Sequence, residues 1–121
     1  SSVRGRATSL VRIAFGAFFD SNRQADIWSI RPGEDELHQL TSAPGHDICP
    51  AYSADGKQIA YISSPKSSDH PDRLRRKSVW LMNADGSSPR PLLDDAGENA
   101  TGVAWYPESG ALLVTTIWLA R

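Results

Sequence analysis

Short apolar segments alternate with polar, glycine- and proline-containing segments along the whole chain. The apolar segments are rich in β-branched and aromatic residues, and convincing helical periodicity is absent. Asp55-Gly56 and Asp85-Gly86 suit tight hairpin turns, because glycine reaches positive φ without a steric cost. The pattern therefore predicts an all-β protein. Its strands are expected at 11–19, 25–31, 36–41, 48–53, 58–63, 78–83, 89–93, 101–106 and 111–118.

The apolar segments repeat in the same order at nearly constant spacing. Ile27-Trp28-Ser29-Ile30 precedes Val79-Trp80-Leu81-Met82 by 52 positions. Ile13-Ala14-Phe15 precedes Ile59-Ala60-Tyr61 by 46 positions, and that segment precedes Leu112-Leu113-Val114 by 53. A repeat of about 45 to 55 residues that carries four short strands is typical of a β-propeller blade.

Two segments resemble the repeat motifs of TolB-like propellers. The segment from Asp47 to Ser63 resembles the family's "PAWSPDGKxIAFxS" motif, and the segment from Ser78 to Arg90 resembles its "xIYVMNADGSxPR" partner. Leu40-Thr41 resembles the "RLT" ending, and the resemblance covers nearly everything from Arg12 to Val114. It implies blades of four antiparallel strands, labelled a to d from the centre outward.

With these labels the chain contains an incomplete ring. Residues 11–121 run b, c, d, then a, b, c, d, then a, b, which is about two blades plus a spare strand; residues 1–10 are expected to be disordered or tag-like. Closed propellers have about four to eight blades. The chain is therefore expected to be a piece of a longer protein, to complete the ring as a homo-oligomer, or to pack as a β-sandwich. A trimer is favoured, since three chains would give the six blades of TolB-like propellers.

Apolar residues on both faces of one strand fit a sheet that is covered on both sides. Ile59 and Tyr61 alternate with Ala60 and Ile62, as expected for a strand between neighbouring blades. The recurring tryptophans are interpreted as core between adjacent sheets rather than as ligand-stacking residues. They are Trp28, Trp80 and Trp105.

Composition narrows the partner classes. The net charge of −1 argues against a protein that depends on nucleic-acid phosphates. The single cysteine, Cys49, excludes an internal disulfide, and no stretch approaches the length of a membrane helix. Arg12 interrupts the apolar residues near the start, so no intact secretion signal is recognised. The resemblance implies a periplasmic location, which the sequence leaves open.

The connections expected on one rim of the ring carry the candidate binding residues. The long 64–77 loop is interpreted either as a patch for an anion or acidic partner or as a solvated surface loop. No paired spacing indicates a metal site, no cofactor motif is found, and no catalytic motif indicates an enzyme. The candidate binding residues are His46, Asp47, His70, Arg73, Arg75, Arg76 and Lys77.

The leading functional prediction is a non-enzymatic interaction module that binds a protein or peptide, as the TolB resemblance implies. The alternative is a carbohydrate-binding or carbohydrate-cleaving propeller, which predicts exposed aromatic rings at Trp105, Tyr106 or Trp118. A truncated fragment of a larger propeller is the third possibility. Because fold alone does not give function, these predictions rest mainly on the family resemblance.

Overall fold

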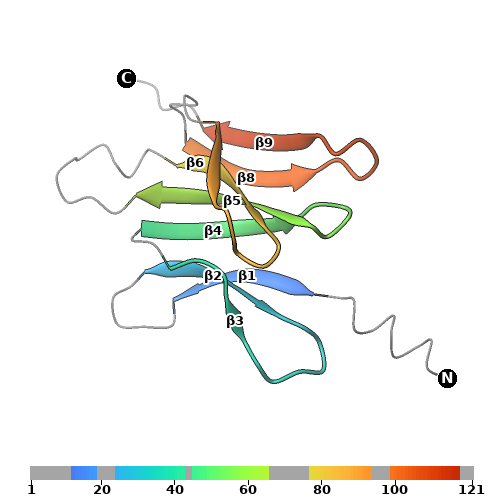
Figure 1. The fold of residues 1–121 in the computed structure, drawn as a ribbon. Helices are drawn as coiled ribbons and strands as arrows, with labels where there is room; N and C mark the ends of the chain where they lie inside the picture. Colours follow the sequence, from blue (N-terminus) through green and yellow to red (C-terminus); the bar gives the residue numbers. More distant parts are fainter. Residues whose placement is uncertain (1–11, 19–23, 43–44, 66–76, 94–98, 118–121) are drawn as a thin grey trace.

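The computed structural model describes residues 12–18, 24–42, 45–65, 77–93 and 99–117 (Figure 1). These residues form strands and connections without a helix, which confirms the all-β prediction. The strands are β1 (Ile13–Phe18), β2 (Ala25–Ile30), β3 (His38–Gln39), β4 (Gly45–Tyr52), β5 (Gln58–Pro65), β6 (Ser78–Asn83), β7 (Arg90–Leu93), β8 (Asn99–Trp105) and β9 (Leu112–Ile117). Residues 1–10, expected to be tag-like, lie outside the described ranges.

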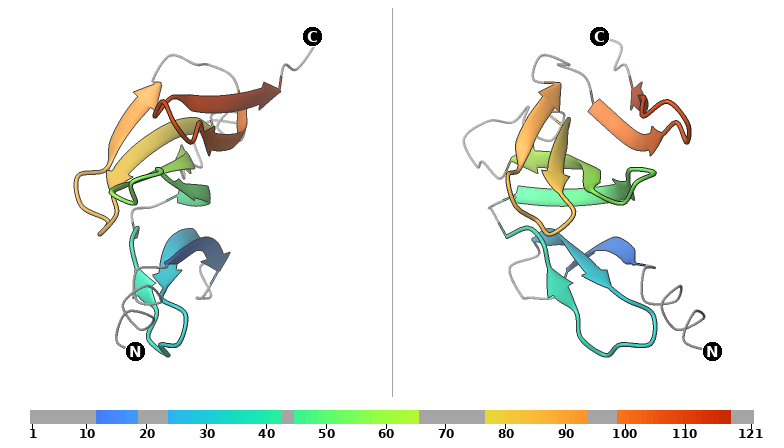
Figure 2. Two further views of the ribbon diagram at one scale, coloured as in Figure 1. Left: turned by 90° about the vertical axis from the view of Figure 1, so that its right-hand side faces the viewer. Right: turned by 45° about the vertical axis from the view of Figure 1, so that its right-hand side comes forward.

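The strands form three separate antiparallel sheets. The first sheet has the order β1-β2-β3, the second β4-β5-β6-β7, and the third β8-β9. This grouping into three, four and two strands is the one that the sequence repeat predicts. The sheets follow one another in chain order from the bottom to the top of Figure 1, and Figure 2 shows the same order from two other sides. We call the contact between the first and second sheets the first seam, and that between the second and third the second seam.

Each seam has its own apolar core, and β5 contributes to both. Ile59 and Tyr61 pack at the first seam with Ile27 of β2, whereas Ile62 packs at the second seam with Ala100 of β8. Neighbouring side chains of a strand point to opposite faces, so one alternating strand can serve two cores. The predicted two-faced character of β5 is therefore confirmed.

Two of the recurring tryptophans lie at the seams, as predicted. The ring of Trp80 packs against the first-seam core, with its centroid 6.5 Å from that of Tyr61. The Nε1 of Trp105 donates a hydrogen bond to the Ala51 carbonyl oxygen across the second seam, at 2.9 Å. Trp28 is half-buried on the first sheet.

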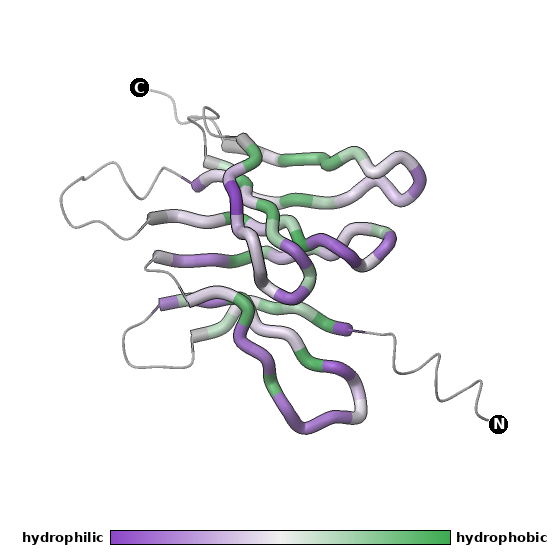
Figure 3. The backbone as a smooth tube through the Cα atoms, in the orientation of Figure 1, coloured by the Kyte–Doolittle hydropathy of each residue, from purple (hydrophilic) through white to green (hydrophobic). Residues whose placement is uncertain are grey.

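The two Asp-Gly turns owe their shape to local chemistry. Gly56 and Gly86 have φ of 73° and 91°, a region that favours glycine. The Asp55 carboxylate accepts a hydrogen bond from the Lys57 backbone N at 3.0 Å. At Gly86 a Cβ atom would lie 2.8 Å from the Leu40 carbonyl oxygen, so this turn also packs on the residue that follows β3. Figure 3 shows hydrophilic turns at the ends of these apolar strands.

The expected strand at 36–41 is much shorter than predicted. Only His38 and Gln39 pair with β2, and beyond them the Thr41 hydroxyl accepts the hydrogen bond of the Ile27 backbone N at 2.9 Å. A side-chain oxygen thus replaces the backbone partner that would have continued the ladder. His38 in this short strand is exposed.

Prolines also occur inside two strands. Pro50 lies in β4 at a bulge between Ile48 and Ala51, where Cys49 has a φ of 57°. Pro91 lies on the edge strand β7. Both positions tolerate a missing N–H, because a bulge interrupts the ladder and an edge strand has one unpaired side.

Candidate functional site

Corresponding strand ends of all three sheets lie on one rim, at the left of Figure 1. The pairs Gly45↔Pro65, Ser63↔Ser78 and Asn99↔Ile117 place the starts of β4, β6 and β8 beside the ends of β5 and β9. The start of β2, which pairs with the end of β1, belongs to the same side. We call these strand ends the shared rim. It is the rim on which the sequence placed the candidate binding residues.

His46 connects the second sheet to the first at this rim. Its Nδ1 accepts a hydrogen bond from the Ala25 backbone N at 3.1 Å. The residue itself is exposed. His46 is therefore exposed at the rim and anchored to the first sheet through its Nδ1.

Asp47 lies next to His46 but is buried, with 5% of its surface exposed. Burial raises the pKa of its carboxyl group, and the negative charge of Asp26 adds to this effect. Hydrogen bonds from Ser63 and Thr41, together with His46, act in the opposite direction on this pKa. Asp47 is therefore a structural acceptor inside the rim rather than an exposed ligand-binding carboxylate.

Thr41 holds three parts of the chain together. Its hydroxyl oxygen accepts the bond from the Ile27 backbone N, and its side chain is also hydrogen-bonded to Asp47. Because a hydroxyl can accept and donate at once, both bonds are satisfied by one side chain. The segment between β3 and β4 is thus tied to β2 and to β4.

Asp26 is the second buried carboxylate of the network, again with 5% of its surface exposed. Gln24 Nε2 donates to its Oδ1 at 3.0 Å, and Gln39 Nε2 donates to its Oδ2 at 3.3 Å. Each carboxylate oxygen thus receives an amide hydrogen, as a buried carboxylate requires. Sequence reasoning missed Asp26. The sequence signal that could have identified it is a charged residue within an apolar segment. The equivalent position of the repeat, 52 residues later, is the uncharged Ser78.

Lys77 occupies the rim at the second seam. Its carbonyl oxygen accepts a hydrogen bond from the Ala100 backbone N at 3.0 Å, which joins the start of β6 to that of β8. The structure therefore brings His46 and Asp47 together and places Lys77 on the same rim. The other predicted binding residues lie outside the described ranges; they are His70, Arg73, Arg75 and Arg76.

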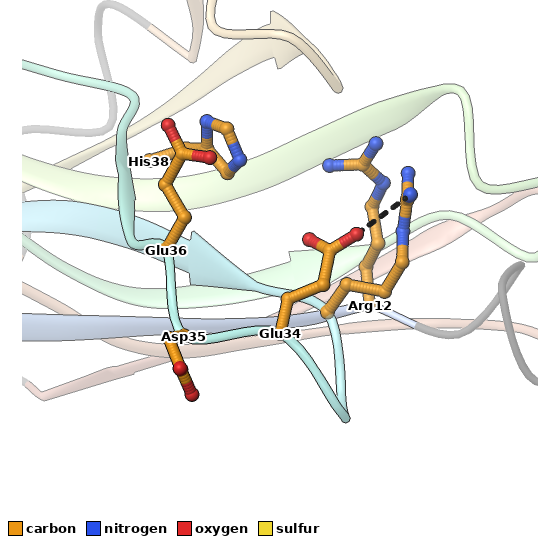
Figure 4. Close-up of a pocket in the computed structure, with 6 residues that line it drawn as sticks. Arg12, Glu34, Asp35, Glu36 and His38 are labelled. Atoms are coloured by element: carbon orange, nitrogen blue, oxygen red, sulfur yellow. Dashed lines mark hydrogen bonds and ion pairs between the residues drawn. The ribbon is translucent and has the colours of Figure 1, made fainter.

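A second polar feature lies at the opposite, hairpin end of the first sheet. It is a depression of about 610 Å³ lined by charged and polar side chains (Figure 4), namely Arg12, Arg31, Glu34, Asp35, Glu36 and His38. An ion pair of 3.2 Å joins the Arg31 guanidinium to the Glu34 carboxylate. Exposed ion pairs of this kind contribute little to stability. All six lining residues are charged or polar, unlike the mainly hydrophobic lining of typical small-ligand pockets.

Within the described ranges, no three His, Cys, Asp or Glu side chains are grouped so that they could hold a metal ion. The described part of the chain also contains no helix with the length and apolar character needed to span a membrane. Of the aromatic residues that a lectin would expose, Trp105 is half-buried at the second seam, Tyr106 is exposed, and Trp118 is outside the described residues.

Neither the known family models nor the curated proteins give a match.

Proposed function

We propose that the chain is a non-enzymatic protein-interaction module built from TolB-type propeller blades. Three antiparallel sheets in the order predicted by the repeat support the blade assignment. In this proposal the ring is completed outside the chain described above, by further copies of the chain or by further blades of a longer protein. The partner is a protein or peptide segment that binds at the shared rim.

The observation that carries this proposal is the rigid polar rim. The His46 ring is anchored through its Nδ1, and the backbone of Lys77 is held through its carbonyl oxygen. Binding sites commonly consist of such groups on a rigid scaffold, since little side-chain freedom is lost on binding. The Lys77 side chain ends in a hydrogen-bond donor, so the rim suits a peptide with acidic side chains or free carbonyl oxygens.

Peptide selection followed by matched substitutions tests the proposal. The chain is immobilised and panned against a displayed random-peptide library, and the enriched peptides are synthesised with a fluorescent label. We expect binding in the micromolar range and weaker binding at higher salt, because exposed charge interactions are screened. His46→Ala and Lys77→Ala are expected to weaken binding about tenfold, the loss of one charge-assisted hydrogen bond.

His38→Ala is the matched control, because His38 is exposed on the first sheet and lines the depression away from the shared rim. Urea unfolding of each variant separates lost binding from lost structure. Enriched peptides that bind all three variants equally would contradict the rim assignment. Binding to an immobilised glycan array without any peptide binding would contradict the proposal and support the alternative of a carbohydrate-binding propeller.

A further inference from the structure

Two arginines lie opposite each other at the hairpin end of the first sheet. Ile13 pairs with Ile30 in the β1–β2 ladder, so continuing this register by one position places Arg12 opposite Arg31. Both side chains line the depression shown in Figure 4. Like charges that face each other on neighbouring strands are destabilising. A negative charge bound between the two guanidinium groups would relieve this repulsion.

The arginine pair lies at the end of the first seam. Arg12 shares its side of β1 with Ala14, which packs on the first-seam core, because side chains two positions apart in a strand point to the same face. Tyr52 at the end of β4 is close by. Burial raises the pKa of its phenol, and the positive charge of Arg12 acts in the opposite direction. The pair therefore borders the second sheet on one side and the depression on the other.

Carboxylates of the described residues pair with one of these arginines and not with the other. Arg31 forms the ion pair with Glu34, at 3.2 Å. Arg12 has no ion pair within the described ranges, and the residues that precede it in the sequence include no Asp or Glu. Figure 4 shows the Asp35 carboxylate pointing away from Arg12 and the Glu36 carboxylate apart from it. The positive charge of Arg12 is thus available to a ligand.

Arg31 has a further hydrogen-bond donor that is not satisfied. Its Nε is buried and has no hydrogen-bond partner, while Glu34 takes only the Nη1 of the same guanidinium. A buried N–H without an acceptor is unfavourable, and native proteins usually pair such groups with protein, water or an ion. Since 30% of the Arg31 side chain is exposed, a rotation of the guanidinium can bring this N–H to the depression.

We propose that the depression binds a carboxylate that bridges the Arg12 and Arg31 guanidinium groups. The two oxygens of a carboxylate match the paired N–H groups of a guanidinium. A monoanion is favoured over a phosphate dianion, because Glu34, Asp35 and Glu36 also line the depression and repel additional negative charge. The carboxylate is that of a small organic acid or of a peptide C-terminus. This site lies at the end of the strands opposite the shared rim, so it does not depend on the proposed function.

A titration of the whole chain followed by ¹H–¹⁵N NMR tests the site. Sodium acetate is the probe for a small acid and N-acetylglycine is the probe for a peptide C-terminus, each compared with sodium chloride at the same ionic strength. We expect the Arg31 Nε–H signal and nearby backbone amide signals to shift and to saturate with a Kd of about 10 mM, the affinity of one or two charge-assisted hydrogen bonds. Inorganic phosphate should bind more weakly than acetate.

Substitutions of exposed side chains assign the binding to the arginine pair. Arg12→Gln should raise the Kd for acetate about tenfold, because it removes one charge-assisted hydrogen bond. Glu34→Gln should lower this Kd about threefold, since it removes a carboxylate that competes for Arg31. Lys57→Gln is the matched control. It removes the same charge from an exposed residue that does not line the depression, and should bind acetate as the wild type does.

The outcomes separate the proposal from a general effect of salt. Shifts that do not saturate, or that are equal in acetate and chloride, would overturn it. An unchanged Kd in Arg12→Gln, or an equal loss in Lys57→Gln, would do the same, and tighter binding of phosphate would contradict a carboxylate ligand. Saturable binding of either carboxylate that depends on Arg12 supports the site, and the tighter of the two probes identifies the source. His46→Ala should leave the acetate titration unchanged, so failure of the rim function would not affect this result.

Discussion

Replacing Asp47 tests the buried network at the first seam most directly. Asp47→Ala removes the acceptor of the Ser63 and Thr41 side chains, whereas Asp47→Asn retains one acceptor oxygen and removes the charge. The two variants therefore separate the hydrogen bonds of this side chain from its burial as an anion.

The magnitude follows from the two bonds. A buried donor that loses its partner costs about 1–3 kcal/mol. Asp47→Ala leaves two such donors without a partner, but it also removes the cost of burying a carboxylate. The expected net loss in the free energy of unfolding is about 2–4 kcal/mol. Asp47→Asn is expected to lie within about 1 kcal/mol of the wild type at pH 7, because hydrogen bonds and charge burial change in opposite directions.

The pH dependence has a definite sign. The folded-state pKa of Asp47 is raised above its ordinary value of 3.8. Between these two values the folded chain binds more protons than the unfolded chain, so unfolding becomes easier as pH rises. The stability that Asp47 contributes is therefore complete below about pH 3.8 and is lost as pH rises through the folded-state pKa. Asp47→Asn should lose this part of the pH dependence.

Urea unfolding followed by tryptophan fluorescence, repeated between about pH 3 and 8, measures both effects. The informative quantity is the free energy of unfolding of the wild type minus that of Asp47→Asn, which should fall with rising pH and then level off. A difference that is flat, or that rises with pH, would refute the burial argument. An Asp47→Ala variant as stable as the wild type would refute the network itself.

Three further predictions concern the seams and turns. Ile59→Ala and Ile62→Ala should each destabilise the chain by about 2–5 kcal/mol in urea unfolding, because each leaves a cavity in a different seam core; a negligible effect at either position would exclude that core. Gly86→Ala should cost more than Gly56→Ala in the same assay. Both glycines have positive φ, but only at Gly86 does a Cβ meet a backbone oxygen, and equal costs would contradict this packing. Burial raises the pKa of Tyr61 to about 12, so its phenol should ionise late in a spectrophotometric titration. Its contribution to stability is complete below about pH 10 and should be lost as pH rises through the folded-state pKa of about 12. If Tyr61→Phe leaves the late step of the titration unchanged, that step does not belong to Tyr61.

Local chemistry made most strands predictable. The Asp-Gly turns at 55–56 and 85–86 end their strands through bonds within a few residues, so the sequence alone places them. The predicted length of the strand at 36–41 was wrong for the opposite reason. Its ladder is interrupted by a bond between Ile27 and Thr41, which are 14 positions apart, and no local pattern signals that partner.

The candidate site was only partly predictable. The rim could be inferred because strand order fixes which connections share one end of antiparallel sheets. The roles of its residues could not, since Asp47 differs from an exposed loop carboxylate only through Asp26, Thr41 and Ser63 around it. Together with Asp47 they come from four strands or connections, and all four meet only when the first two sheets stack.

The sequence by itself determined the strand class, the turn positions and the period of the repeat, because alternation and turn residues act over a few neighbouring positions. Only the tertiary structure decided which faces are covered and which are not. Ile59 is buried and Ile13 is half exposed although their positions in the repeat are equivalent, since burial depends on whether another sheet lies opposite. The same dependence on distant partners buries the Asp26 and Asp47 carboxylates at the first seam.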